Sequence, residues 1–253
     1  MSEKNPEQNS FASHFIELRS RIINSLIFIF IIFVIGYIFA ENIYNFLVDP
    51  YAQAVKDDGI DRRLIFTALH ETFVTYLKLA FFAAIFLGSP ILLTQIWKFV
   101  APGLYKSEKK ALLPYLIATP ILFLLGGMLV YYLVMPLAIK FFLSFETSAQ
   151  LNTLPIQLEA KVNEYLSLIM RLIFAFGLSF QLPVLLNLLA RVGAIDSKYL
   201  QERRKYFIVI IFAAAAVLTP PDPITQIGLA IPLLILYELS ILSVKITEKK
   251  NNA

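Results

Sequence analysis

The stretch IINSLIFIFIIFVIGYIFA, residues 22–40, decides the fold class of this chain. Its nineteen residues carry no charge. At 1.5 Å of rise per residue they form a helix about 29 Å long, close to the thickness of a bilayer's hydrocarbon core. More such runs follow in a sequence that is 58% hydrophobic and 16% charged, with a mean hydropathy of +0.71. Because a soluble domain carries about a quarter charged residues, the sequence predicts an all-α integral membrane protein.

The uncharged runs and the polar segments between them predict six transmembrane helices in a single transmembrane domain, residues 1–253. An amphipathic helix over about 10–21 precedes the first span, because apolar and polar residues there recur at helical spacing. The segment after the first span, which contains Asp49 and Pro50, is predicted to be an exposed loop. The predicted spans are 22–40, 75–97, 112–136, 165–190, 206–219 and 223–243.

The fifth and sixth helices are predicted to be short. Residues 206–219 number fourteen, and a helix of that length reaches only about 21 Å. The sixth apolar run meets Glu238 after fifteen residues. Prolines at 220, 221 and 223 force a turn between the two helices. We therefore expect the tip of this hairpin to fall short of the far membrane surface and to thin the bilayer there.

The lysines and arginines predict the orientation of the chain. In a six-span topology, fifteen of them lie on the side of the two termini and seven on the other side. Cytoplasmic loops carry the excess of basic residues. The N- and C-termini are therefore predicted to be cytoplasmic. Because this topology accounts for the basic clusters, a nucleic-acid partner is not expected.

Motifs for catalysis or cofactor binding are missing from the sequence. There is no cysteine, and neither His14 nor His70 belongs to an H-E-x-x-H metal motif. Residues 177–180, GLSF, lack the second glycine of a G-x-S-x-G nucleophile elbow, and no glycine-rich phosphate loop is present. We therefore predict no catalytic residues, no metal and no cofactor.

Two glutamates stand out because they lie in basic segments. Glu17 is four residues before Arg21, and Glu108 lies among lysines 106, 109 and 110. One interpretation is ordinary charge neutralisation at the surface, worth a few tenths of a kcal/mol. The other is binding of a guanidinium group, which a carboxylate takes bidentately. Before any family is considered, both stay open.

Polar side chains within the apolar runs are costly in a membrane. We expect them to face other helices or a wet cavity rather than lipid. Arg171 is expected near the outer end of its run, where its side chain reaches the interface. The others are Gln181, Asn187, Gln226 and Glu238.

Four stretches together resemble the TatC family, the receptor subunit of the twin-arginine protein translocase. They are HFIELRSR at 14–21, WKFVAPGLYKSE at 97–108, AFGLSFQLP at 175–183 and LTPPD at 218–222, with Gln226 beyond. Their order and spacing extend over nearly the whole chain. The resemblance implies a glove-shaped, six-helix fold with cytoplasmic termini in the bacterial cytoplasmic (inner) membrane. It also implies binding of twin-arginine signal peptides and export of folded proteins, driven by the proton-motive force.

The same resemblance assigns roles to individual residues. Glu17 and Glu108 match the acidic positions that recognise the paired arginines of the signal. Pro50 matches a proline of the first periplasmic loop, and Gln181 stands where some members have a glutamate. Asp222 and Gln226 match positions that meet single-span TatA- and TatB-type subunits, and self-association is also implied. The remaining residues of the signal-binding motifs are Arg19, Phe99, Leu104 and Tyr105.

A small secondary transporter or channel is the competing interpretation. Its solute path would be lined by Arg171, Gln181, Gln226 and Glu238. The low density of ionisable residues within the spans argues against it, since neither Arg171 nor Glu238 has an evident buried partner in the sequence. That pattern favours a docking scaffold, in which binding rather than bond-making is the activity.

Overall fold

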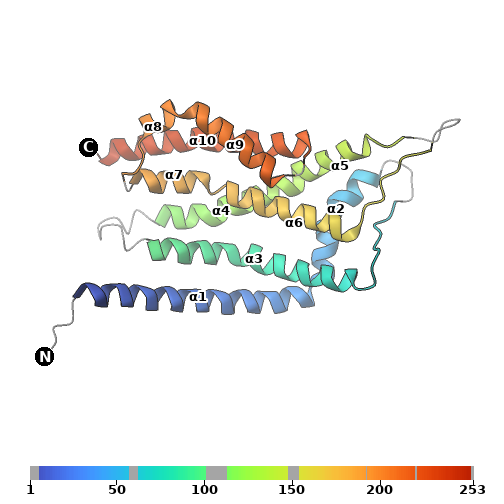
Figure 1. The fold of residues 1–253 in the computed structure, drawn as a ribbon, viewed down its shortest axis with the longest axis horizontal. Helices are drawn as coiled ribbons and strands as arrows, with labels where there is room; N and C mark the ends of the chain where they lie inside the picture. Colours follow the sequence, from blue (N-terminus) through green and yellow to red (C-terminus); the bar gives the residue numbers. More distant parts are fainter. Residues whose placement is uncertain are drawn as a thin grey trace. The chain divides into compact units, whose positions relative to one another are not determined.

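The computed structural model describes residues 6–56, 62–100, 113–147, 154–191, 193–219 and 221–251 (Figure 1). Within these ranges the protein is helical, and its β structure is limited to two isolated bridges, Ile65 with Lys161 and Thr147 with Ile156. The predicted all-α fold is therefore confirmed. The chain forms two compact units, Met1–Ile43 with Tyr76–Pro120, and Tyr44–Thr75 with Ile121–Ala253. The division does not test the expected single transmembrane domain, which stays a prediction.

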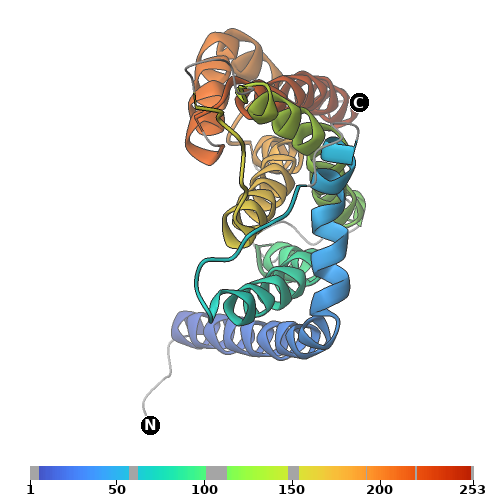
Figure 2. The same cartoon turned by 90° about the vertical axis from the view of Figure 1, so that its right-hand side faces the viewer.

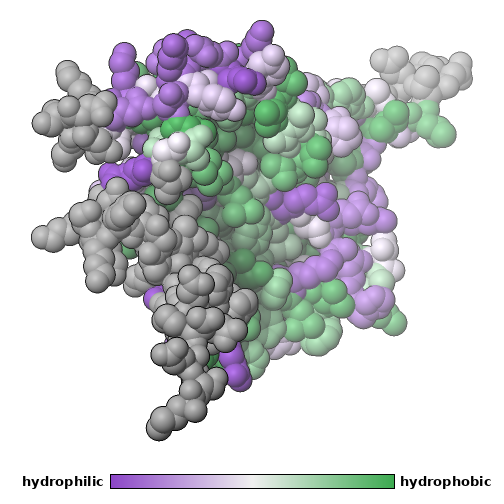
Figure 3. Space-filling view, turned by 60° about the vertical axis from the view of Figure 1, so that its left-hand side comes forward, coloured by the Kyte–Doolittle hydropathy of each residue, from purple (hydrophilic) through white to green (hydrophobic). Residues whose placement is uncertain are grey.

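Five helical segments in the described part of the chain are long and apolar enough to cross a membrane. Exposed apolar side chains, such as those coloured green in Figure 3, suit a lipid environment. Together with the composition, these segments make this a multi-pass membrane protein, while the number of six spans stays a prediction. The five segments are Arg19–Ile38, Glu71–Gln95, Pro114–Leu143, Val162–Arg191 and Pro223–Glu248.

The first unit is built on two antiparallel helices, α1 (Pro6–Ile38) and the part of α3 (Glu71–Val100) from Tyr76 onward, which lie side by side in Figures 1 and 2. The predicted surface helix and first span form the single helix α1. Glycines allow close contact: a Cβ atom at Gly36 would lie 3.3 Å from the Ala80 carbonyl oxygen, and one at Gly88 would lie 3.2 Å from Ile29. These two contacts set the register of the pair.

Helix α2 (Ala40–Val55) replaces the loop predicted after the first span. That prediction was wrong because the charged residues hide an amphipathic pattern, in which Leu47 and Tyr51 are buried one turn apart. Pro50 lies inside this helix and cannot donate to the Phe46 carbonyl. The Tyr131 hydroxyl donates to that carbonyl instead, at 2.8 Å. A contact from a distant part of the chain therefore compensates for the proline.

The third apolar run is divided into α4 (Leu113–Leu129), the π-helical turn η4 (Val130–Val134) and α5 (Met135–Leu143). Pro136 explains the division, because its ring nitrogen cannot donate to the carbonyl four residues earlier and the ring would clash with it. The wider π turn just before the proline relieves that conflict. In η4, the Met135 N–H donates to the Val130 carbonyl, a bond of the i to i+5 type.

The fourth run is divided into α6 (Val162–Ser179) and α7 (Leu182–Arg191), with Pro183 at the second position of α7. Helix α6 packs tightly on α4. A Cβ atom at Gly126 would lie 2.7 Å from the Phe176 carbonyl oxygen, and one at Gly177 would lie 2.8 Å from the Phe123 ring. The two glycines therefore let the helices approach more closely than any other residue would allow.

The end of the chain forms α8 (Ser197–Glu202), α9 (Arg204–Leu218) and α10 (Pro223–Asn251), and α10 packs against α7, α8 and α9. Helix α9 is short, with 15 residues, as predicted. The prediction of a short sixth helix was wrong, because α10 has 29 residues. It continues past Glu238, which pairs with Arg204 of α9 at 2.8 Å. A paired charge near a helix surface does not end a membrane helix.

Candidate functional site

The end of the first unit where α1 begins and α3 finishes carries several of the predicted binding residues. Arg21 donates to the Gln95 side-chain oxygen at 2.8 Å and so joins the two helices there. The glycine contacts of the pair have the same antiparallel register. If this register is continued by one turn along each helix, the backbone of Glu17 lies opposite the backbone of Phe99. One described residue of each predicted signal-binding motif, Glu17 and Phe99, thus has its backbone at the same end of the helix pair.

Most of the predicted binding side chains themselves lie outside the described residues. Glu17 is in α1 and Phe99 in α3, but the side chains of both belong to the undescribed part. Leu104, Tyr105 and Glu108 fall in residues 101–112, also outside it. Arg19 is described, and its side chain is exposed. The twin-arginine site therefore stays a prediction.

Asp222 and Gln226 come together at the beginning of α10. The Asp222 carboxylate is buried and accepts hydrogen bonds from the backbone N–H of Thr225, at 2.7 Å, and from its hydroxyl. This is N-capping, which satisfies donors that the first helical turn leaves free. The Gln226 N–H donates to the Asp222 carbonyl at 3.3 Å, and its side chain is half-buried. Asp222 therefore has a structural task as well as any role in binding.

Gln181 and Pro50 have local structural roles. Gln181 lies at the break between α6 and α7, where its amide donates to the Gly177 carbonyl at 3.4 Å. Pro50 is buried within α2, next to the stacked rings of Phe46 and Tyr131, whose centroids are 4.4 Å apart. Neither observation tests the roles that the family resemblance implies for these residues.

An ion pair between Arg62 and Glu146 was not anticipated from the sequence. Two guanidinium nitrogens donate to the two carboxylate oxygens, each at 2.6 Å, and the side chains are only 4% and 18% exposed. The Leu158 N–H donates to the same carboxylate at 2.7 Å. The hydrogen bonds from Arg62 hold the pKa of Glu146 below its usual range. This pair ties together two segments that lie 84 residues apart.

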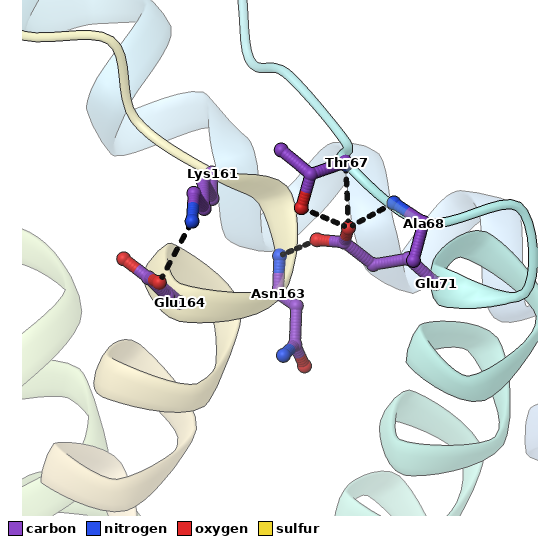
Figure 4. Close-up of polar contacts among 6 residues, drawn as sticks. All are labelled: Thr67, Ala68, Glu71, Lys161, Asn163 and Glu164. Carbon is purple, nitrogen blue, oxygen red and sulfur yellow. Dashed lines mark hydrogen bonds and ion pairs between the residues drawn. The ribbon is translucent and has the colours of Figure 1, made fainter.

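A second unanticipated network is centred on Glu71, at the beginning of α3 (Figure 4). Its carboxylate accepts from the backbone N–H groups of Thr67 at 2.8 Å, Ala68 at 3.3 Å and Asn163 at 3.4 Å. The network thereby connects the start of α3 with the start of α6. Thr67 precedes Glu71 by four residues, whereas the capping-box motif S/T-x-x-E has a spacing of three, so that motif does not predict this network.

Two cavities adjoin this network in the second unit. The polar cavity, of about 230 Å³, includes His70, Glu71 and Asn163. The apolar cavity, of about 210 Å³, includes Met135 of α5 and Leu168 of α6. Lys161 and Glu164 line both. Within the described ranges no group of three His, Asp or Glu side chains is arranged to hold a metal ion.

Comparison with known proteins gives one consistent result. The family described as Sec-independent protein translocase protein (TatC) matches residues 13–232. Relatives called Sec-independent protein translocase protein TatC include that of Magnetococcus marinus, 48% identical over 94% of this chain and 84% of its own length. The Escherichia coli K12 relative is 35% identical over 90% of this chain and 85% of its own length. A crystal structure of a twin-arginine translocase receptor, TatC, is similar with a TM-score of 0.75 and 36% identity, covering 92% of this chain and 98% of that one.

Proposed function

This chain belongs to the TatC family of Sec-independent protein translocase subunits, and from that membership we propose that it is the receptor that binds twin-arginine signal peptides. Binding nucleates export of folded proteins across the bacterial cytoplasmic membrane. The proton-motive force supplies the energy, since the sequence has no nucleotide-binding motif. The observation that supports this proposal is that the backbones of Glu17 and Phe99, one residue from each predicted motif, lie opposite each other at one end of α1 and α3.

In the proposed site, Glu17 and Glu108 take the two guanidinium groups of the signal. A carboxylate binds a guanidinium through two parallel hydrogen bonds, a geometry that a lysine ammonium cannot match. Phe99, Leu104 and Tyr105 pack against the residues beside the arginine pair, and Arg19 adjusts the local charge. The Arg21–Gln95 hydrogen bond supports this arrangement, because it holds α1 and α3 together one turn away.

Crosslinking tests this role. A precursor with a photoreactive group beside its arginine pair is incubated with membranes that contain the Glu108→Ala protein. Loss of a charge-assisted bidentate contact should lower the affinity by about 10- to 100-fold, so the crosslink yield falls while the amount of protein in the membrane stays unchanged. Glu202→Ala is a matched control, because Glu202 is an exposed glutamate on α8. A wild-type yield with Glu108→Ala would overturn the assignment.

We further propose that the beginning of α10 is where a single-span subunit of the TatA or TatB type docks. The short α9 and the half-buried Gln226 next to the capped Asp222 support this. The competing solute-path function loses support, since Glu238 pairs with Arg204 and both side chains are about half exposed. Both termini are proposed to be cytoplasmic, and self-association of the receptor is also part of the proposal.

A further inference from the structure

The polar and apolar cavities of the second unit share one wall. Lys161 and Glu164 line both cavities and form an ion pair of 3.7 Å between Nζ and Oε1, with side chains 44% and 72% exposed. Figure 4 shows this pair beside the Glu71 network. Since 3.7 Å exceeds the length of a hydrogen bond, the ammonium and the carboxylate are not closed on each other. An amphipathic ligand has access to both groups.

The two cavities begin at the same level but reach different depths along the spans. The polar cavity reaches only the first turns of α3 and α6, as far as Val74 and Glu164. The apolar cavity has Glu159 and Lys161 at its outer end and extends further in, to Leu168 of α6 and Met135 of α5. One candidate span ends at Leu143 and another begins at Val162, and the neighbouring residues Phe142 and Lys161 line the same cavity. The polar cavity and the outer end of the apolar cavity therefore lie at the level of lipid headgroups, and the inner part of the apolar cavity lies toward the acyl chains.

The charges in the polar cavity are of both signs. Lys161 offers an ammonium group, and Glu71 and Glu164 offer carboxylates. Glu71 is held in place by three backbone N–H groups, so it is a fixed negative charge rather than a mobile one. A purely anionic headgroup would bring its phosphate close to these two carboxylates. A headgroup that carries both a phosphate and a cation is complementary to the whole cavity.

We propose that the two cavities together bind one phospholipid with an ethanolamine headgroup. The phosphate pairs with Lys161, and the primary ammonium donates to Glu164 and Glu71. One acyl chain fills the apolar cavity between α5 and α6. Ethanolamine is favoured over choline because its ammonium has three N–H donors, as a lysine does, whereas a quaternary ammonium has none. This site is independent of the signal-peptide site proposed above.

Retention of lipid by the full-length protein tests the proposal. The protein is reconstituted with equal amounts of phosphatidylethanolamine and phosphatidylglycerol, extracted in detergent and examined by native mass spectrometry. The wild type should retain about one phosphatidylethanolamine per chain. The Lys161→Gln/Glu164→Gln variant should lose about tenfold in retention, the effect of losing a hydrogen bond to a charged group. Lys198→Gln/Glu202→Gln is the matched control, since it removes another exposed ion pair, of 3.9 Å, on α8.

A second variant tests the apolar half. Ala160 lines the apolar cavity, and its backbone carbonyl accepts a hydrogen bond from the Ile65 N–H, which a change of side chain leaves in place. Ala160→Trp should fill the space of the acyl chain and also lower retention. Soluble phosphoethanolamine should not displace the lipid, because it lacks the chain. Equal retention of the two lipids, wild-type retention by both variants, or displacement by phosphoethanolamine would each overturn the proposal.

Discussion

Replacing Arg62 with methionine should lower the stability of the second unit more than the same replacement of the exposed neighbour Arg63. The side chain is 4% exposed and gives two hydrogen bonds of 2.6 Å to Glu146, which is 18% exposed. Without Arg62, the carboxylate keeps the Leu158 N–H as a backbone donor. Breaking a fully buried pair costs about 3–5 kcal/mol. Because water still reaches Glu146, we expect about 2–3 kcal/mol here.

Thermal unfolding of the detergent-solubilised protein measures this effect. For a chain of this size, 2–3 kcal/mol corresponds to a decrease in Tm of roughly 5–10 °C. The midpoint is read from the loss of the monodisperse peak in size-exclusion chromatography, at one heating time for all variants, because unfolding of such proteins is irreversible. Arg63→Met is the matched control, since Arg63 is exposed, and it should change stability by less than about 0.5 kcal/mol.

The double variant Arg62→Met/Glu146→Leu separates pairing from packing. It removes both charges, so it should recover much of the stability lost in Arg62→Met. Acidification gives an independent check. The folded-state pKa of Glu146 lies below its unfolded value, so the pair's contribution is complete above the unfolded pKa, about 4.3, and is lost as the pH falls through the folded pKa. Arg62→Met should weaken this acid dependence. If Arg62→Met and Arg63→Met unfold at the same temperature, the reasoning is refuted.

Two further predictions concern helix packing and capping. Gly126→Ala should cost about 1–3 kcal/mol, because its Cβ would lie 2.7 Å from a backbone oxygen, whereas Gly228→Ala, with its nearest contact at 3.4 Å, should be tolerated; equal melting temperatures of the two variants would contradict this. Asp222→Ala should cost about 1 kcal/mol through loss of the cap of α10, and Asp222→Asn should retain most of it. In the same thermal assay, an alanine variant as stable as the asparagine variant would show that the cap contributes nothing.

The sequence predicted elements well where a property adds up along the chain. Uncharged runs of about 20 residues indicated membrane helices, and five such segments are present in the described residues. The predictions that failed rested on the positions of charged residues. Glu238 was interpreted as the end of a helix, and the charges around Asp49 as the sign of a loop. The structure has a helix in both places: α10 continues past Glu238, which pairs with Arg204, and α2 forms because Leu47 and Tyr51 bury one of its faces.

For the candidate sites too, local sequence motifs were predictable and contacts between distant residues were not. The resemblance to the TatC family came from motifs that are contiguous in sequence, and the family match over residues 13–232 confirmed it. The Arg62–Glu146 pair and the Glu71–Asn163 contact join residues 84 and 92 positions apart. No periodicity connects such residues, so neither contact could be predicted from one sequence.

By itself, the sequence determined that this protein is an all-helical membrane protein of the TatC family. Hydropathy, helix length and contiguous motifs are local properties, and these suffice for that conclusion. Only the tertiary structure decided how the helices tolerate Pro50, how closely Gly126 approaches α6, and which charges meet beside the two cavities. These features depend on side chains brought together from distant segments, and their free energies come from burial and pairing that no local pattern records.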